Sequence, residues 1–164
     1  MALLFWDASA IVKRYWHEEG SDTVDAVFAH SSGHTMATTP VGYAETYSIL
    51  LRRLNSGVLD IPTFSMAASA LETEVVVGED FGLMSITDTI VFESIPIMRK
   101  HNLNSTDAAI VALLVGYGRM PGSETVLLIA ADKRLLRAAK QEGFRVINPE
   151  ENSPAEIPSL LGTP

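Results

Sequence analysis

Short apolar runs alternate along the chain with longer segments in which apolar side chains recur at helical spacing. The runs at 3–6 and 126–130 are almost wholly apolar, which is typical of strands buried on both faces of a sheet. Three further short strands are predicted at 36–38, 83–86 and 144–147. Helices are predicted over residues 8–18, 22–30, 40–54, 62–74, 88–101, 106–115 and 132–142.

This alternation predicts the α/β fold class. Strands that alternate with helices form a parallel sheet with helices on both faces. We therefore expect a three-layer α/β/α sandwich around a parallel sheet of four to five short strands. Residues 1–148 form the predicted domain. Residues 149–164, which contain four prolines, are predicted to be an extended or poorly ordered tail.

Composition adds limits to this picture. The chain has no cysteine, which excludes disulfides and thiolate metal sites. No apolar run is long enough to span a membrane and no segment reads as a signal peptide, so we expect a soluble, cytoplasmic protein. The net charge of −8 argues against non-specific nucleic-acid binding through a generally basic surface.

The basic residues are clustered rather than spread evenly. Three of the clusters lie close in sequence to acidic residues that follow predicted strands or begin predicted helices, so a locally basic rim around an acidic site is compatible with the sequence. The clusters are Lys13/Arg14, Arg52/Arg53, Arg99/Lys100 and Lys133/Arg134/Arg137/Lys140.

Four acidic residues occupy positions that favour a common site. Asp7 follows the strand at 3–6, and Asp132 follows the strand at 126–130 with one residue between. Both are expected at the carboxyl edge of the sheet, where sites form in parallel α/β folds. Asp107 lies in the first turn of its predicted helix. Glu45 lies between Val41 and Ile49 on one helical stripe, an unusual position for a solvated carboxylate.

Each acid also has a plain structural interpretation. Asp7 and Asp132 are good N-caps for the helices that follow them, and Asp107 complements a helix dipole. Glu45 could pair with Arg52 or Arg53. Taken together, however, four acids on four separate elements favour one carboxylate cluster.

Such a cluster has a definite chemistry. Mg²⁺ and Mn²⁺ prefer oxygen ligands, and a bound cation relieves the repulsion between neighbouring carboxylates. It would also activate a water molecule and stabilise the charge that develops on a phosphate group. The sequence therefore predicts metal-assisted phosphodiester hydrolysis with water as the nucleophile.

The segments that carry these acids resemble the motifs of PIN domains, in particular the VapC-like toxins of prokaryotic toxin–antitoxin pairs. The resemblance covers about residues 2–150, with the motifs in family order. The matching segments are LLFWDASAIVKRY with Asp7, YAETYSILLRRL with Glu45, NSTDAAIVALL with Asp107, and LIAADKRLLRAAKQEGFRVINPE with Asp132.

This resemblance implies a PIN-like nuclease that depends on Mg²⁺ or Mn²⁺ and cuts RNA. It implies that Asp7 and Asp107 are the principal metal ligands, and that Glu45 and Asp132 bind the metal directly or through water. All four acids are then catalytic. The supporting hydroxyls would be Ser9 and Thr106. A homodimer, and neutralisation by a small cognate antitoxin, are implied as well.

Two basic residues follow Asp132 directly in the sequence. Lys133 and Arg134 either form a solvated helix face or reach RNA phosphates. Two other functions remain open. One is a non-catalytic PIN scaffold that binds RNA or protein. The other is a small-molecule phosphohydrolase with Asp7 as nucleophile, although such enzymes usually have a second aspartate where this chain has Ser9.

Overall fold

The computed structural model describes residues 1–162 and is built around one parallel sheet. The strand order is β3-β2-β1-β4-β5, so the first strand of the chain is the central one. Every pairing in the sheet is parallel, as the alternation of strands and helices predicted. The strands are β1 (Ala2–Trp6), β2 (Thr35–Thr38), β3 (Phe81–Leu83), β4 (Thr125–Ile129) and β5 (Arg145–Ile147).

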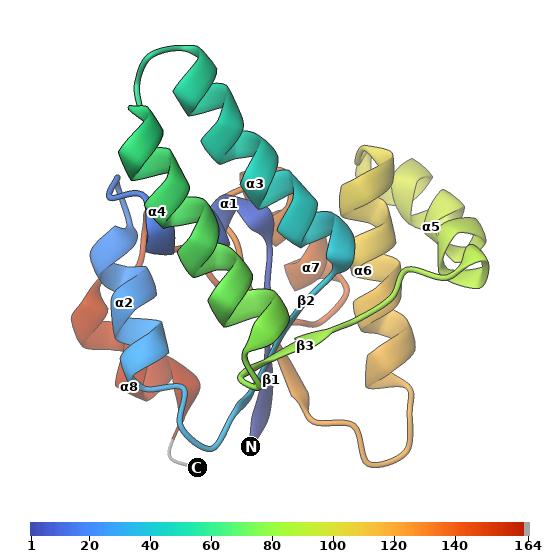
Figure 1. Ribbon diagram of the computed structural model, residues 1–164. Helices are drawn as coiled ribbons and strands as arrows, with labels where there is room; N and C mark the ends of the chain where they lie inside the picture. Colours follow the sequence, from blue (N-terminus) through green and yellow to red (C-terminus); the bar gives the residue numbers. More distant parts are fainter. Residues whose placement is uncertain (163–164) are drawn as a thin grey trace.

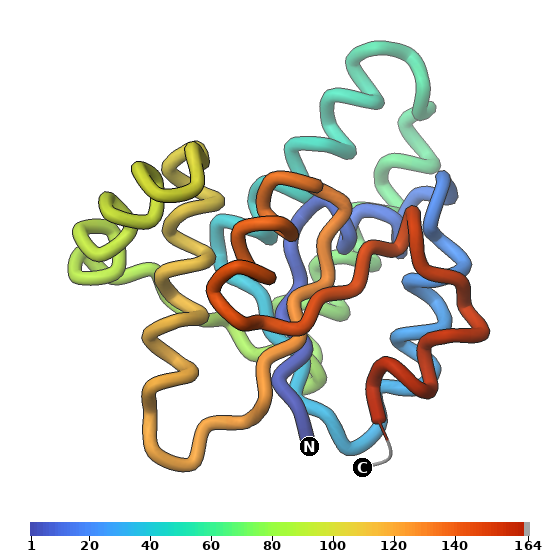
Figure 2. Tube along the Cα trace, turned by 180° about the vertical axis from the view of Figure 1, so that it is seen from behind, coloured from blue at the N-terminus to red at the C-terminus, as the bar shows by residue number. Residues whose placement is uncertain are grey.

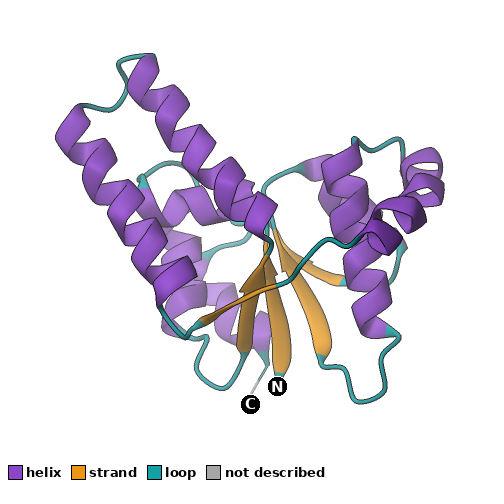
Figure 3. Cartoon of the chain, turned by 45° about the vertical axis from the view of Figure 1, so that its right-hand side comes forward, coloured by secondary structure: helices purple, strands orange, loops and turns teal. Residues whose placement is uncertain are grey.

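Helices cover both faces of the sheet (Figures 1 and 3). The first face is covered by α1 (Ala8–Tyr15), α2 (Ser21–Ala29), α3 (Pro40–Asn55), α4 (Ile61–Glu72) with the π-helical turn η1 (Thr73–Val77), and α8 (Ile157–Leu161), which follows the 3₁₀ turn η2 (Pro154–Glu156). The second is covered by α5 (Asp88–His101), α6 (Ser105–Gly118) and α7 (Lys133–Gln141). The predicted three-layer α/β/α sandwich is confirmed.

The central strand shows why the first apolar run is uninterrupted. Leu4 and Trp6 pack into the core of the first face, and Leu3 and Phe5 into the core of the second. All four side chains are at most 2% exposed. Because neighbouring side chains of a strand point to opposite faces, a strand covered on both sides has no position for a polar residue.

The structure differs from the prediction at the third strand. A strand was predicted at 83–86, but β3 spans 81–83 and pairs with β2 from Met36 opposite Phe81 to Thr38 opposite Leu83. The apolar residues Met84 and Ile86 lie beyond the strand and pack into the core of the second face. The strand is difficult to predict from the sequence because it contains Gly82, and glycine has little preference for strands.

The predicted tail is the second difference. Residues 154–161 form η2 and α8 rather than an extended or poorly ordered segment, whereas residues 163–164 lie outside the described part of the chain. Ser153 and Glu156 form a capping box that starts the turn. Ile157 and Leu161, one helical turn apart, are buried in the core of the first face. This apolar pair anchors the segment.

Within residues 1–162, no helix has the length and apolar character that crossing a membrane demands.

Candidate active site

The four predicted acids, Asp7, Glu45, Asp107 and Asp132, line one cavity of about 240 Å³. They come from the end of β1, from α3, from the first turn of α6 and from the start of α7. The cavity lies at the carboxyl edge of the sheet, where β1 and β4 end in register with Trp6 opposite Ile129. The fold thus brings together residues that are up to 125 positions apart in sequence.

Asp7 is fixed by the residue two positions after it. Its side chain is almost fully buried, and Oδ2 accepts hydrogen bonds from the backbone N–H of Ser9 (2.9 Å) and from the Ser9 hydroxyl. The same hydroxyl oxygen accepts a hydrogen bond from the N–H of Ala131 at 2.9 Å. Ser9 therefore links the acid after β1 to the loop after β4.

Asp132 and Asp107 are held at the starts of their helices. Asp132 Oδ1 caps α7 by accepting hydrogen bonds from the N–H groups of Arg134 (2.7 Å) and Leu135 (3.1 Å). Asn104 caps α6, and its side-chain amide donates to Asp107 Oδ2 at 2.9 Å. Asp7 also caps its helix, so capping and a position on the cavity wall are compatible.

Glu45 reaches the cavity from a different direction, along one stripe of α3. Ser48, Ile49 and Arg52, at three, four and seven positions further on, line the same cavity. The predicted pairing of Glu45 with Arg52 or Arg53 does not form. Arg53 instead pairs with Glu18, and the Arg52 guanidinium donates to Ser48 Oγ at 2.9 Å.

Burial and the charges of the neighbouring acids raise the pKa values of Asp7, Glu45 and Asp107. Burial is the largest cause of the raised pKa of Asp107, which lies at about 6, and the charges of Asp132, Asp7 and Glu45 add to it while Arg134 opposes them. Burial also raises the pKa of Asp7, and burial together with the charge of Asp7 raises the pKa of Glu45. This surplus of negative charge favours a proton or a cation.

The donor set fits a hard divalent cation. All four side chains offer carboxylate oxygens, the ligands that Mg²⁺ and Mn²⁺ prefer. Each aspartate uses only one of its two oxygens in the hydrogen bonds described above, which leaves the second oxygen available. Within residues 1–162, however, no three acidic or histidine side chains lie close enough to hold a metal ion together. In this arrangement a cation would contact at most two of these side chains directly, and water would complete its coordination.

Only part of the predicted basic rim lies near the acids. Arg52 lines the cavity, and Arg134 is close enough to lower the pKa of Asp107. Lys133 is exposed and pairs with Glu151 at 3.3 Å. Lys13 is buried and pairs with Glu18 and Glu150.

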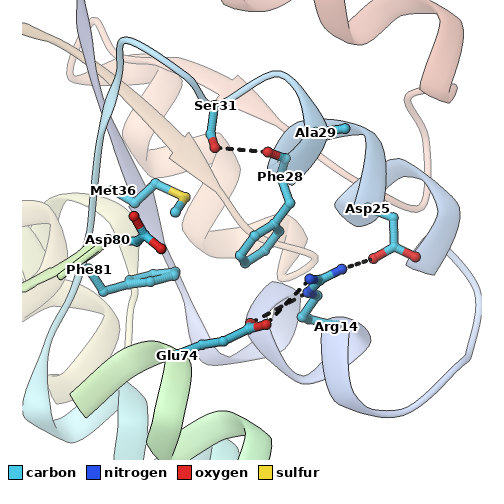
Figure 4. A pocket seen from close by; sticks show the side chains of 9 residues that line it. All are labelled: Arg14, Asp25, Phe28, Ala29, Ser31, Met36, Glu74, Asp80 and Phe81. Carbon is cyan, nitrogen blue, oxygen red and sulfur yellow. Dashed lines mark hydrogen bonds and ion pairs between the residues drawn. The ribbon is translucent and has the colours of Figure 1, made fainter. Parts of the chain in front are cut away.

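Arg14 lies in a separate cavity of about 430 Å³ (Figure 4). Its guanidinium pairs with Asp25 at 2.7 Å and with Glu74 at 3.4 Å, and it lies 4.6 Å from the centre of the Phe28 ring. These partners satisfy its charge within the fold. Arg14 is therefore a structural residue of this second cavity rather than part of the rim around the acids.

Thr106, the second predicted supporting hydroxyl, does not line the cavity and makes no side-chain hydrogen bond within the described part of the chain. Its supporting role stays a prediction. Beyond the residues expected from the sequence, Ser48 lines the cavity and Asn104 contacts Asp107, while Arg52 occupies the wall rather than only the rim. The spacing from Glu45 along α3 is the signal that identifies Ser48 and Arg52, and the Asn104-x-x-Asp107 spacing identifies Asn104.

Comparison with known proteins agrees with this geometry. Residues 4–141 match the sequence family described as the PIN domain. No curated protein sequence is significantly similar to the chain. The fold is similar to that of PAE2754 from Pyrobaculum aerophilum, with a TM-score of 0.62 and 17% sequence identity over 88% of this chain and 89% of that one. At this identity the likeness shows the fold alone.

Proposed function

The chain belongs to the PIN-domain family, whose members are generally nucleases, and from that premise we propose that it is a divalent-metal-dependent endoribonuclease. The observation that carries the proposal is the carboxylate cavity. Four separate elements deliver Asp7, Glu45, Asp107 and Asp132 to one site, where the neighbouring negative charges raise the pKa values of Asp7, Glu45 and Asp107. A purely structural role does not require four acids at one place.

In the proposed mechanism, Asp7 and Asp107 would hold the metal, and Glu45 and Asp132 would contribute to its binding directly or through water. A bound Mg²⁺ or Mn²⁺ supplies an activated water molecule and stabilises charge on the scissile phosphate. Ser9 and Asn104 orient Asp7 and Asp107 through the hydrogen bonds described above.

The positive charges beside the acids act on the substrate. Arg52 lines the cavity, and Arg134 lies at the start of α7 next to Asp132. Their positive charges would attract the RNA backbone towards a site that is otherwise acidic, and we propose this as their role. Lys133, which is largely exposed, is a third proposed phosphate contact.

The test is RNA cleavage by the purified protein and by Asp7→Asn. Labelled single-stranded and structured RNAs are incubated in Mg²⁺ or Mn²⁺, with and without chelator. We expect the wild-type protein to cut RNA only with metal, and Asp7→Asn to be at least about 100-fold slower because a metal ligand is lost. Asp60→Asn is the matched control, since Asp60 caps α4 away from the cavity. It should cleave at the wild-type rate.

Two results would contradict the proposal. If the wild-type protein binds no divalent metal and cuts no RNA, the non-catalytic scaffold replaces the nuclease. If it instead releases phosphate from small phosphate esters such as p-nitrophenyl phosphate, and Asp7→Asn does not, the phosphohydrolase alternative is supported. Cleavage that survives in Asp7→Asn would remove Asp7 from the site.

We further propose that this nuclease is the toxin of a toxin–antitoxin pair, acts in the cytoplasm as a homodimer and is neutralised by a small antitoxin. The toxin proposal rests on the family resemblance. The dimer proposal is supported by an exposed apolar patch on α5. The apolar side chains of Val91, Phe92 and Ile95 on α5 are exposed, and Phe92 is 70% exposed. A second copy could cover them.

These finer proposals have their own tests. Induced expression should arrest growth unless the product of an adjacent small reading frame is expressed with it, and Asp7→Asn should not be toxic. Light scattering should give the mass of a dimer for the wild-type protein and of a monomer for Phe92→Glu. A monomeric wild-type protein, or harmless expression of an active nuclease, would contradict the respective proposal.

A further inference from the structure

A groove of about 470 Å³ runs between α7 and the segment that follows α7, from β5 to residue 152. In Figure 2, α7 lies beside this C-terminal segment. The groove shares no lining residue with the acid cavity. Its wall includes three basic side chains, Lys133, Arg137 and Lys140, together with one carboxylate, Glu151, and the amide of Asn148.

The groove is basic in a chain that is acidic overall. Lys133, Arg137 and Lys140 follow one another at helical spacing along one face of α7, whereas Leu135 and Ala139 face the core. Arg137 and Lys140 form no ion pair within residues 1–162, and the pair of Lys133 with Glu151 is exposed. An exposed pair of this kind holds a charge only weakly, so it leaves Lys133 free to bind another anion.

Asn148 supplies a second and independent observation. It is only 4% exposed and lines the groove, yet its side-chain Nδ2 has no hydrogen-bond acceptor within the described residues. Its orientation is set, because Oδ1 accepts a hydrogen bond from the N–H of Glu150 at 3.0 Å, which leaves the amide nitrogen as the free end. A buried donor without a protein partner is uncommon in folded proteins, and this one can be satisfied by water or by an acceptor from a bound molecule.

The position of the groove relates it to the acids. Asn148 directly follows β5, whose last residue Ile147 pairs with Ile129 of β4. The groove therefore opens at the same carboxyl edge as the acid cavity. From there it follows α7 for about two turns, or ~10 Å, from Lys133 to Lys140.

We propose that this groove binds the phosphodiester backbone of the RNA strand whose scissile bond lies at the acids. The inference rests on the proposed nuclease function and adds a second binding site to it. Three cations outnumber the single carboxylate in the described wall of the groove, Glu151, and together with the amide of Asn148 they match phosphate oxygens, which only accept hydrogen bonds. Among the described side chains of the groove none is aromatic, so bases have no surface to stack on. Binding here is independent of base sequence.

The first experiment measures RNA binding without cleavage. A fluorescent single-stranded RNA of mixed sequence is titrated with Asp7→Asn, alone or combined with Arg137→Ala and Lys140→Ala. We expect the added changes to raise Kd about tenfold. They should also make the slope of log K against log salt less steep by about 1.4, because about 0.7 is lost per phosphate contact. Arg99→Ala with Arg119→Ala, which removes the same charge elsewhere, should leave both values unchanged.

A second variant tests the buried amide. Asn148→Asp keeps the shape of the side chain but replaces the free donor with an acceptor, so it should weaken RNA binding about tenfold. Asn55→Asp adds the same charge at the exposed end of α3 and is the control. Circular dichroism establishes that both variants fold. Equal affinities for the two folded variants would remove Asn148 from the site.

The outcomes separate this inference from the nuclease proposal. If the wild-type protein cuts RNA but the Arg137 and Lys140 changes affect Kd no more than the control changes, the groove is not an RNA site while the nuclease stands. If those changes abolish binding of poly-glutamate instead of RNA, the groove is a site for an acidic protein and the inference is wrong. If no RNA is cut but binding depends on the groove as expected, the groove is an RNA site, while the nuclease proposal and the link to a scissile bond at the acids fail.

Discussion

Ser9 is the residue on which the arrangement of the acids depends most directly. Its hydroxyl group donates to Asp7 and accepts from the N–H of Ala131, so one small side chain joins the ends of β1 and β4. A hydroxyl in this position fixes the orientation of Asp7 without carrying charge into the cavity.

We predict that Ser9→Ala lowers the cleavage rate about 10-fold to 100-fold and weakens metal binding to a similar extent. It also leaves the Ala131 N–H without an acceptor, at a cost of about 1–3 kcal/mol in the free energy of unfolding. Steady-state cleavage and calorimetric metal titration measure the first effect. Ser31→Ala, which removes a hydroxyl that donates only to the Phe28 carbonyl, is the control. A Ser9→Ala protein with wild-type metal affinity would contradict this role.

The ionised carboxylate of Asp107 is needed for the proposed function but lowers the stability of the metal-free fold. Its pKa in the folded protein, about 6, lies above the value of about 3.9 for an unfolded chain. The folded state therefore holds the proton more tightly. The stability that this group contributes is present below pH 4 and is lost as the pH rises through 6.

We therefore predict that Asp107→Asn raises the Tm of the metal-free protein at pH 7.5, by a few degrees, while abolishing cleavage. The difference in Tm between variant and wild type should shrink as the pH falls from 7 to 4.5, because the wild-type carboxyl is then protonated. Added Mg²⁺ should stabilise the wild type more than the variant. Thermal scans in chelator measure this, and a lower Tm for the variant at pH 7.5 would contradict it.

At this scale the sequence predicts the four acids but only part of their surroundings. Asp7 and Asp132 follow strand ends and therefore have few possible positions in a parallel fold. Arg52 and Ser48 reach the cavity only because α3 turns one particular stripe towards it. That rotation depends on packing between helices, which the sequence pattern does not specify.

At the scale of elements, the start of α2 is a point of close packing. Gly20 precedes the helix with φ of 88°, a left-handed conformation that favours glycine. A Cβ atom at this position would lie 2.8 Å from the carbonyl carbon and oxygen of Pro149. The segment after β5 therefore rests directly against the turn before α2.

Gly20→Ala should accordingly destabilise the protein by about 2–5 kcal/mol, the sum of left-handed strain and overpacking. Gly57→Ala is a matched control, because Gly57 also has a positive φ of 76° but no atom lies within 4 Å of a Cβ there. It should cost about 1–2 kcal/mol from strain alone. Urea unfolding of both variants gives the comparison, and equal losses would show that Pro149 yields to the added methyl group.

Elements that are defined by their own residues were predicted more accurately than elements that are defined by distant contacts. Helix α3 was predicted from Pro40 onward because Thr39 and Pro40 are themselves a start signal. The central strands were predicted because burial on both faces leaves a continuous apolar run. Strand β3 was misplaced because a three-residue edge strand containing Gly82 is defined by its pairing with β2 rather than by its own residues.

At the scale of the whole molecule, the C-terminal segment completes the first layer. Ile157 and Leu161 enter the same core cluster as Leu4 and Trp6 of the central strand. The segment was predicted to be a tail because it contains several prolines. Pro154 and Pro158, however, each occupy the first turn of a helical element, where proline is well tolerated. The burial of these two apolar residues depends on α2, far away in sequence.

We predict that Ile157→Ala destabilises the protein by about 2–5 kcal/mol, because it opens a cavity in the core. Leu160→Ala, which truncates a side chain only partly buried against the same cluster, should cost less. Chemical denaturation of the two variants provides the measurement. A negligible effect of Ile157→Ala would mean that the segment does not contribute to the core in solution.

The central position of β1 has a consequence for how the protein is made. The ribosome synthesises β1 before the other strands of the sheet, yet one of its two edges stays unpaired until residues 125–129 of β4 have left the exit tunnel. Asp132, the last of the four acids to be made, emerges immediately afterwards. A nascent chain therefore carries no assembled carboxylate cavity until β4 and Asp132 have emerged. The proposed nuclease cannot act before that point, which protects the ribosome and messenger that are producing it.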